Sequence, residues 1–148
     1  MEKGAENPEP CRERRTGSLR LSGVWNAYDK EKGEYHTMKK IESGSLAVML
    51  DEETLGLRIE KDGVVWNTDP KKTPELIFAE GTYRFLDAEE ISHEVYSFGV
   101  GCGIRSRYAG FAGTPYAFET IIWIEAVDET FWMEWIPLCE EGLHPVKV

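Results

Sequence analysis

Hydrophobic and polar residues alternate in two short segments in the first half of the chain. The segments are SLAVMLD at 45–51 and TLGLRIE at 54–60, and in each a leucine, valine or isoleucine recurs at every second position. This period of two is typical of a β-strand that buries one face. The residues predicted to share the buried faces are Leu46, Val48 and Leu50 in the first strand and Leu55, Leu57 and Ile59 in the second.

A turn signal follows the second segment. Asp62-Gly63 separates it from the run VVWNT at 64–68. Asp-Gly is favoured in two-residue hairpin turns, because both central residues of a type I′ turn adopt positive φ. The two flanking runs are therefore predicted to pair as an antiparallel β-hairpin.

Two longer runs, FETIIWIEA at 118–126 and ETFWMEWIPL at 129–138, are rich in β-branched and aromatic residues. They are predicted to form adjacent antiparallel strands. Both alternating sets of the first run contain apolar residues, which is expected of a strand near the middle of a two-layer sandwich. One set is Phe118, Thr120, Ile122 and Ile124, and the other is Glu119, Ile121, Trp123 and Glu125.

Glycines interrupt the segment 91–108 at Gly99, Gly101 and Gly103. We expect an extended chain that bends sharply there, with the glycines packed closely beneath an aromatic side chain. The helix candidate is Asp87-Ala88-Glu89-Glu90, a single turn at most. The whole pattern predicts an all-β fold, an antiparallel β-sandwich of about ten strands with little or no helix.

The N-terminal segment differs from the rest in composition. Residues 1–17 contain prolines, glycines and alternating charges but almost nothing apolar. Such a segment does not bury enough apolar surface to offset its ordering entropy. We therefore expect a disordered tail at 1–17 and a single β-sandwich domain at 18–148.

Charge narrows the range of partners. The 148 residues include 27 acidic and 17 basic side chains, for a formal net charge of -10. A field of this sign repels phosphate groups, so nucleic acid is not expected as a partner. No apolar run is long enough to span a membrane and no signal peptide is evident, so we expect a cytoplasmic protein. The odd number of cysteines (Cys11, Cys102 and Cys139), without C-x-x-C spacing, favours a reducing compartment.

Familiar catalytic and cofactor motifs are missing from the sequence. The GxGxG run at 99–103 has neither the spacing nor the following helix of a phosphate-binding loop. His36, His93 and His144 are isolated, so no zinc site is predicted. Glutamates are abundant, but paired acids cleave a glycosidic bond only at a defined separation, which a sequence does not show. No catalytic residue, metal or cofactor is therefore assigned.

Aromatic residues are more informative, with five Trp, six Tyr and six Phe. An exposed indole is suited to stacking on the apolar face of a sugar ring. Trp123 and Trp135 have strongly apolar neighbours and are predicted to be core residues. Trp25 and Trp66 lie near turn-rich ends, where burial and exposure are both open. Trp132 points away from Trp135 on the same strand and is the preferred platform.

Basic and aromatic residues together suggest a ligand site. Arg105 and Arg107 share one face just beyond the glycines and are suited to gripping an anionic or polyhydroxylated group. The candidate ligand-binding residues are Trp66, Arg105, Arg107, Tyr108 and Trp132.

Three blocks in order resemble a known family. They are EETLGLRIEKDGVVWNTDP at 52–70, GVGCGIRSRYAGF at 99–111 and FETIIWIEAVDETFWMEWIPLCEE at 118–141. Between Ile41 and Val148, the chain resembles the N-terminal β-sandwich of glycoside hydrolases of the family-31 α-glucosidase type, a domain similar to galactose mutarotase. The resemblance implies a sandwich packed against a (β/α)₈ barrel that carries the catalytic carboxylates. Those carboxylates have no matching positions here.

In that family the chain would continue beyond GLHPVKV at 142–148, so the resemblance implies a fragment, a truncated product or a sandwich that has lost the chemistry. The function it favours is a non-catalytic, carbohydrate-associated module with a carbohydrate ligand and either a catalytic-barrel partner or a second copy of itself. Two alternatives stay open. One is a mutarotase-type epimerase using His93 and a glutamate as base and acid. The other is a structural or oligomerisation domain whose tryptophans are all in the core or an interface.

Overall fold

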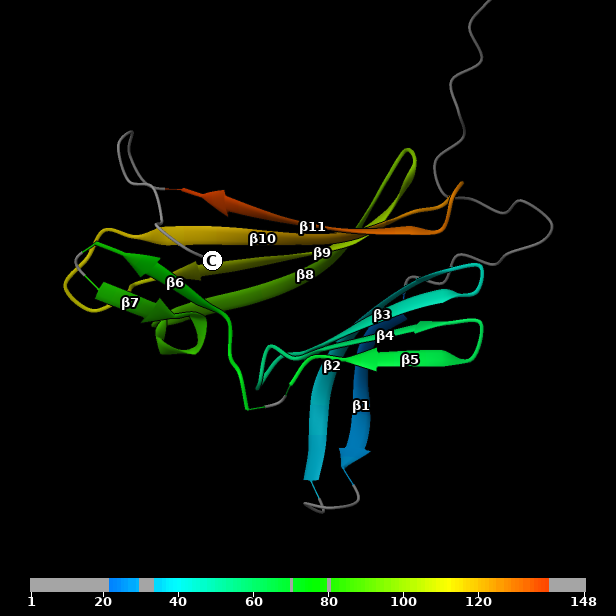
Figure 1. Cartoon of the computed structure of the whole chain (residues 1–148), viewed down its shortest axis with the longest axis horizontal. Helices are drawn as coiled ribbons and strands as arrows, with labels where there is room; N and C mark the ends of the chain where they lie inside the picture. The colour runs from blue at the N-terminus through cyan, green and yellow to red at the C-terminus, as the bar shows by residue number, and fades with distance from the viewer. Residues whose placement is uncertain (1–21, 30–33, 70, 80, 139–148) are drawn as a thin grey trace, which may run out of the picture.

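The structure is a computed structural model, which describes the backbone of residues 22–29 and 34–36 and all atoms of 37–69, 71–79 and 81–138 (Figure 1). These residues form eleven β-strands and one short 3-10 turn. All strand pairs are antiparallel. The predicted all-β fold with little helix is confirmed.

The N-terminal part of the chain forms a five-stranded sheet in sequence order. Its strands are β1 (Ser22–Asp29), β2 (Glu34–Ser43), β3 (Leu46–Asp51), β4 (Leu57–Lys61) and β5 (Val64–Asn67). The predicted hairpin joins β4 to β5, and its turn residues Asp62 and Gly63 have φ of 51° and 79°. The Asp-Gly pair therefore adopts the backbone for which it is favoured.

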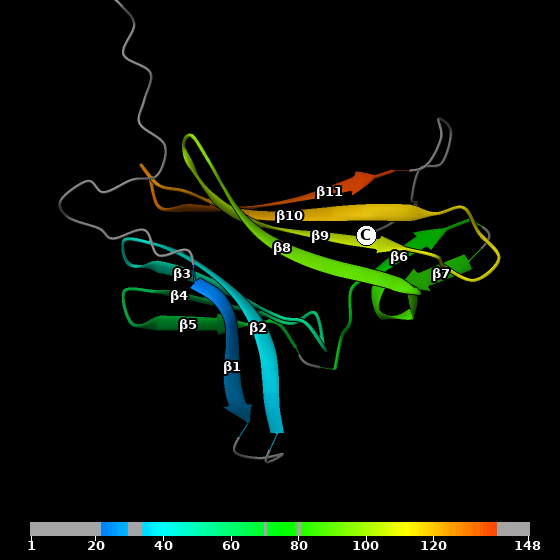
Figure 2. The ribbon, with the colours of Figure 1, turned by 180° about the vertical axis from the view of Figure 1, so that it is seen from behind.

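The C-terminal part forms a four-stranded sheet in the order β11-β10-β9-β8. Its strands are β8 (Glu90–Phe98), β9 (Gly101–Ala109), β10 (Ala117–Glu125) and β11 (Thr130–Pro137). Between the two sheets in sequence lie the hairpin β6 (Glu75–Phe78) and β7 (Gly81–Arg84) and the 3-10 turn η1 (Phe85–Asp87). Figures 1 and 2 show this hairpin at one end of the four-stranded sheet and the five-stranded sheet toward the other.

Two core clusters lie against one side of the four-stranded sheet, here called its inner face. The first joins β2 and β3 to β9 and β10 and consists of Ile41, Leu46, Val48, Leu50, Cys102, Ile104, Ile122 and Ile124. The second lies beneath the β6–β7 hairpin and η1 and consists of Leu55, Leu76, Phe78, Phe85, Tyr108, Phe111, Tyr116 and Phe118. The inner face is thus covered along its length by two different parts of the chain. The opposite side of the sheet is called its outer face.

Three local predictions need correction. The segment 91–108 is not one bent strand but a hairpin, in which Phe98 of β8 pairs with Gly101 of β9. Leu55 is buried but has φ of 58° in a turn, because the Asp51 carboxylate accepts hydrogen bonds from the backbone N–H groups of Glu53 and Thr54. The helical turn lies slightly earlier than predicted, at Phe85–Asp87.

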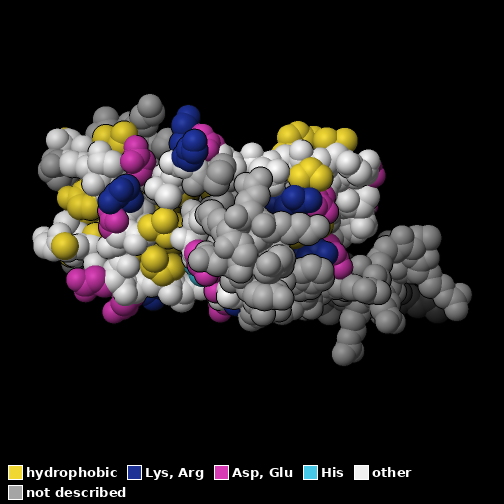
Figure 3. Space-filling model, turned by 90° about the horizontal axis from the view of Figure 1, so that it is seen from below, with side chains coloured by type: hydrophobic (Ala, Val, Ile, Leu, Met, Phe, Trp, Pro, Cys, Tyr) yellow, Lys and Arg dark blue, Asp and Glu magenta, His cyan; other side chains and the backbone are white. Residues whose placement is uncertain are grey.

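Charged and hydrophobic side chains are mixed on the surface seen in Figure 3, where hydrophobic groups appear in several separate places among basic and acidic ones. No helix in the described part of the chain has the length and apolarity needed to cross a membrane. Cys102 lies in the core, as expected of a small apolar strand residue. The predicted tail at 1–17 and the cysteines Cys11 and Cys139 lie outside the described residues.

Candidate functional site

An aromatic row crosses the outer face of the four-stranded sheet. Tyr96 of β8 is paired with Gly103 of β9. Gly103 is paired in turn with Trp123 of β10, and Trp123 with Trp132 of β11. Residues directly opposite each other project from the same face of a sheet. Three aromatic side chains and one glycine from four strands therefore stand in a line.

The glycines of β9 leave room for aromatic rings. A Cβ atom at Gly103 would lie 2.9 Å from three atoms of the Tyr96 side chain, Cε1, Cζ and Oη. A Cβ atom at Gly101 would lie 3.2 Å from Cζ of Phe98. The two rings thus rest on backbone that has no side chain of its own. The predicted close packing beneath aromatic residues is confirmed for Gly101 and Gly103. It is wrong for Gly99, where no atom lies within 4 Å of a Cβ.

An open depression of about 170 Å³, here called the outer-face pocket, is bordered by Tyr96, Phe98, Ile121, Trp123 and Glu134. The rings of Phe98 and Trp123 meet edge to face, with centroids 5.5 Å apart and planes at 75°. The rings of Tyr96 and Phe98 have centroids 5.7 Å apart and planes at 32°. The pocket therefore combines differently oriented aromatic walls with a single carboxylate.

Trp132 lies on the edge strand β11, beside the pocket residue Trp123. Its indole stacks on that of Trp123, with ring centroids 5.7 Å apart and planes at 15°. Trp123 is half-buried, whereas Trp132 is 49% exposed. Stacking orients the exposed indole while leaving part of its surface to solvent. The predicted exposure of Trp132 is confirmed.

Arg105 lies next to the pocket on β9. Its Nη1 donates a hydrogen bond of 3.1 Å to Oε1 of Glu94, and its Cζ is 5.0 Å from the centroid of the Tyr96 ring. Burial raises the pKa of Tyr96, an effect that Arg105 opposes and that Glu134 and Glu94 reinforce. The Tyr96 hydroxyl is therefore neutral near pH 7 and retains its proton for donation to an acceptor.

The structure does not bring all five predicted ligand residues together. Arg107 is exposed on the outer face, opposite Glu119 of β10, two positions along β9 from Arg105. Trp66 is 53% exposed but belongs to β5 of the five-stranded sheet. Tyr108 is 2% exposed and stacks on Phe85 with centroids 4.4 Å apart, so its prediction as a surface contact is corrected.

The core predictions for tryptophan are half right. Trp135 packs against the second core cluster, with its ring centroid 5.2 Å from that of Phe85. Trp123, which is predicted to be a core residue, projects from the outer face with its paired neighbour Trp132, because β2 and β3 pack against the opposite face of β10. The side chain of Trp25 lies outside the described residues.

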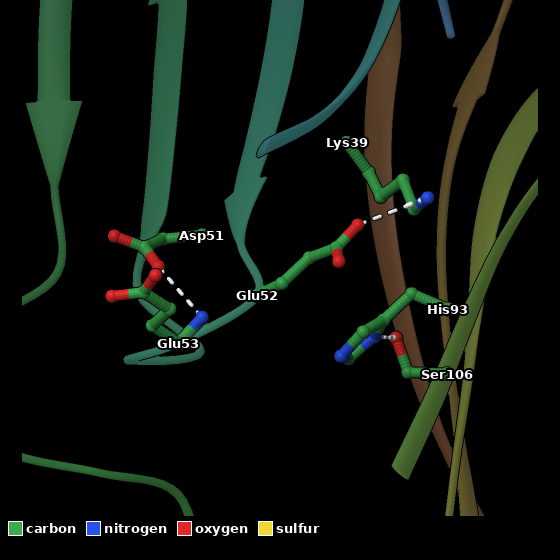
Figure 4. A network of polar contacts seen from close by, with 6 residues as sticks. All are labelled: Lys39, Asp51, Glu52, Glu53, His93 and Ser106. Carbon is green, nitrogen blue, oxygen red and sulfur yellow. Dashed lines mark hydrogen bonds and ion pairs between the residues drawn. The ribbon is translucent and has the colours of Figure 1, made fainter. Parts of the chain in front are cut away.

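A separate polar cluster lies at the inner face beside β8 (Figure 4). Nδ1 of His93 and Oγ of the buried Ser106 share a hydrogen bond of 2.7 Å. Nearby, Nζ of Lys39 and Oε1 of Glu52 form an ion pair of 2.9 Å. Burial lowers the pKa of His93, Glu52 raises it and Lys39 lowers it further. This cluster lies on the opposite face of the sheet from the outer-face pocket.

This arrangement bears on the epimerase alternative. His93 projects from the inner face as the paired neighbour of Ser106, whereas Glu94 and Glu134 project from the outer face. A base and an acid on either side of one sugar ring are therefore not assembled from these residues. Among the described residues, no group of three or more His, Cys, Asp or Glu side chains converges as a metal site.

Sequence reasoning missed Tyr96, Phe98 and Glu134 as pocket residues. The alternation along each strand is consistent with these residues facing outward. Whether they lie close together depends on the pairing of β8 with β9 and of β10 with β11. Trp132 and Glu134 are two positions apart and share a face, a signal already present in the sequence. The partners from β8 become visible only when 91–108 is recognised as a hairpin.

Comparison with known proteins shows a similarity to solved structures of a glycoside hydrolase. No protein-family model and no curated protein sequence matches the chain. Solved structures of the α-N-acetylgalactosaminidase NagBb from Bifidobacterium bifidum do match. The GalNAc complex has a TM-score of 0.67 and 38% identity over 70% of this chain, and the ligand-free form has 0.65 and 38% over 68%. The complex with Gal-NHAc-DNJ has 0.67 and 37% over 73%.

The chain spans 17% of the length of each of these solved chains. Identity at this level, together with the TM-scores, supports a glycoside-hydrolase domain. The similarity does not extend to the family-31 relation expected from the sequence. The comparisons therefore indicate a β-sandwich domain similar to one part of a glycoside hydrolase.

Proposed function

We propose that the chain is a non-catalytic, carbohydrate-associated module of a glycoside-hydrolase-like protein, and that it binds a sugar ring on the outer face of the four-stranded sheet. The observation that carries this proposal is the stacked pair of Trp123 and Trp132, in which Trp132 is 49% exposed. A large aromatic side chain that is oriented by stacking yet open to solvent provides a platform for the C–H face of a pyranose.

Polar groups around the platform supply the hydrogen bonds that a sugar requires. The Glu134 carboxylate and the Tyr96 hydroxyl belong to pocket-lining residues, and the Arg105 guanidinium lies over Tyr96. Ligand sites commonly combine apolar walls with a few such polar groups. Arg107 is one more exposed donor on the same face.

Similarity to NagBb favours N-acetylgalactosamine as the first ligand to test, since one of the matching structures is described as a GalNAc complex. The matched region is 17% of that enzyme, which favours an accessory role beside a catalytic domain. The proposal therefore includes a catalytic barrel as the partner against which this module packs, as the sequence resemblance implied.

The test is a tryptophan-fluorescence titration of the full 148-residue chain with N-acetylgalactosamine, galactose and glucose. Saturable quenching or a spectral shift with at least one sugar is expected, together with loss of the response in Trp132→Ala. The matched control is Trp66→Ala, because Trp66 is equally exposed but lies on the other sheet. A folded chain that gives no response to any of these sugars overturns the proposal, as does a response that survives Trp132→Ala.

The outer-face pocket does not support the epimerase alternative, because His93 and the pocket glutamate lie on opposite faces of the sheet. The carboxylate near His93 is that of Glu52, which is already ion-paired with Lys39. The structural alternative predicts that substitution of Trp132 changes self-association instead of sugar response. Sedimentation velocity on the same Trp132→Ala sample distinguishes the two.

A further inference from the structure

We propose that the outer-face pocket selects a positively charged sugar, with the ammonium group of an amino sugar placed among Tyr96, Phe98 and Trp123 beside Glu134. This inference rests on the proposed function, since the pocket adjoins the Trp123–Trp132 platform. It goes further in naming the chemical class of the ligand.

The walls of the pocket are suited to a cation. Three of its five bordering residues are aromatic, and the Phe98 and Trp123 rings lie nearly perpendicular, at 75°. The face of an aromatic ring carries negative electrostatic potential and attracts an ammonium group within about 6 Å of its centroid.

The pocket also provides an anionic partner. Glu134 borders it, and no hydrogen bond or ion pair involves its carboxylate within the described part of the chain. The side chains of the outer face carry a net negative charge. Its acidic residues are Glu90, Glu94, Glu119, Glu125 and Glu134, and its basic residues are Arg105 and Arg107.

Arg105 already makes a contact between a cation and an aromatic ring on this surface. Its guanidinium lies over the Tyr96 ring, with Cζ 5.0 Å from the centroid, and its charge is offset by the ion pair with Glu94. Because that pair is neutral as a unit, a second cation entering the pocket meets the uncompensated carboxylate of Glu134. Charge complementarity therefore favours an ammonium over a carboxylate or a phosphate.

The experiment compares galactosamine, galactose and N-acetylgalactosamine by the same fluorescence titration, in a buffer in which the amine carries its proton. Galactosamine is expected to bind about tenfold more tightly than either neutral sugar, as a partly desolvated cation–π contact and one carboxylate together allow. Its affinity should fall as salt is added, since salt screens exposed charges. The affinity for galactose should not.

The variant Glu134→Gln keeps the shape of the side chain and removes its charge. It is expected to reduce the preference for galactosamine over galactose to about twofold, because the ammonium loses its counter-charge whereas the glutamine side chain still offers hydrogen bonds to either sugar. Glu119→Gln is the matched control, since Glu119 lies on the same face outside the pocket.

The outcomes separate this inference from the proposed function. If neutral sugars bind through Trp132 and galactosamine binds no better, the inference is overturned and the proposed function stands. If Glu134→Gln leaves the preference intact, the assigned anion is wrong and the inference is overturned. If galactosamine and tetramethylammonium both bind with sensitivity to Glu134→Gln and neutral sugars do not bind, the cation site is supported and the general sugar platform is overturned.

Discussion

The ring of Tyr96 rests on Gly103, its paired neighbour on the next strand, so closely that a Cβ at 103 would lie 2.9 Å from Cε1, Cζ and Oη of the ring. Any residue larger than glycine would occupy the space of the ring. The position of one wall of the outer-face pocket therefore depends on a residue that contributes no side chain to it.

Gly103→Ala is expected to displace the Tyr96 ring and weaken sugar binding, while the chain stays folded. The clash involves the far end of one flexible side chain and not backbone, so the free energy of unfolding should change by no more than about 1 kcal/mol. Sugar titration and a urea melt on the same sample measure both effects. Gly99→Ala is the control, since no atom lies within 4 Å of a Cβ at that position. Unchanged binding in Gly103→Ala would show that the Tyr96 wall is not used.

Gly101→Ala should behave differently from Gly103→Ala. A Cβ at Gly101 would lie 1.9 Å from the backbone oxygen of Ile124 on the neighbouring strand β10. The backbone of β10 cannot move aside as a side chain can, so the β9–β10 pairing must open locally. The free energy of unfolding should fall by about 3 kcal/mol or more. A large fall in the midpoint of urea unfolding is expected, with Gly99→Ala again close to wild type. A Gly101→Ala midpoint within error of wild type would contradict the close packing of these two strands.

Local features of this fold were predictable from the sequence because their causes are local. The Asp62-Gly63 turn requires two residues with positive φ, and the burial of Leu46, Val48 and Leu50 follows from period two within one strand. The same alternation along the strand also indicates that Tyr108 is buried. Tyr108 is one position from Arg107, so a strand that exposes the arginine buries the tyrosine.

The composition of the pocket was not predictable in the same way. Both faces of β10 carry apolar side chains, so the sequence does not show whether Ile122 or Trp123 faces the core. That choice depends on β2 and β3 packing against the face with Ile122 and Ile124. The row from Tyr96 to Trp132 likewise depends on register across four strands, a non-local property.

Substitution of Phe85 is expected to lower the stability of the fold without changing sugar affinity. Phe85 is fully buried and stacks on Tyr108 beneath the inner face. Phe85→Ala should lower the free energy of unfolding by about 3–5 kcal/mol, since truncation of a buried aromatic residue leaves a cavity. Where the variant remains folded, as judged by circular dichroism at low temperature, its sugar affinity should match wild type. Phe98→Ala is the counterpart, expected to weaken binding with a smaller loss of stability, and the reverse ranking would contradict the assignment of the two faces.

The polar cluster at the inner face predicts a pH dependence of stability. Burial lowers the pKa of His93 in the folded chain below its ordinary value of 6.5. As the pH falls through 6.5, the unfolded chain binds a proton at this position before the folded chain does. The stabilisation that arises from this difference in pKa should therefore be complete above that pH. It should decrease as the pH falls toward the lowered pKa of the folded state. Below that pKa the free energy of unfolding should show no further loss from His93. Urea unfolding between pH 8 and about pH 5 measures this dependence.

Two variants isolate the contribution of His93 from that of the many carboxylates. His93→Gln should lack this pH-dependent loss, so the difference in free energy of unfolding between wild type and variant should change with pH in that interval. Glu52→Gln should deepen the loss, because the Glu52 carboxylate opposes the lowering of the His93 pKa. The Lys39 ammonium, which pairs with Glu52, acts in the opposite sense and would then lie near His93 without its counter-charge. Parallel pH profiles for wild type and His93→Gln would show that His93 titrates alike in the folded and unfolded chains, and that its burial between the sheets has no energetic consequence.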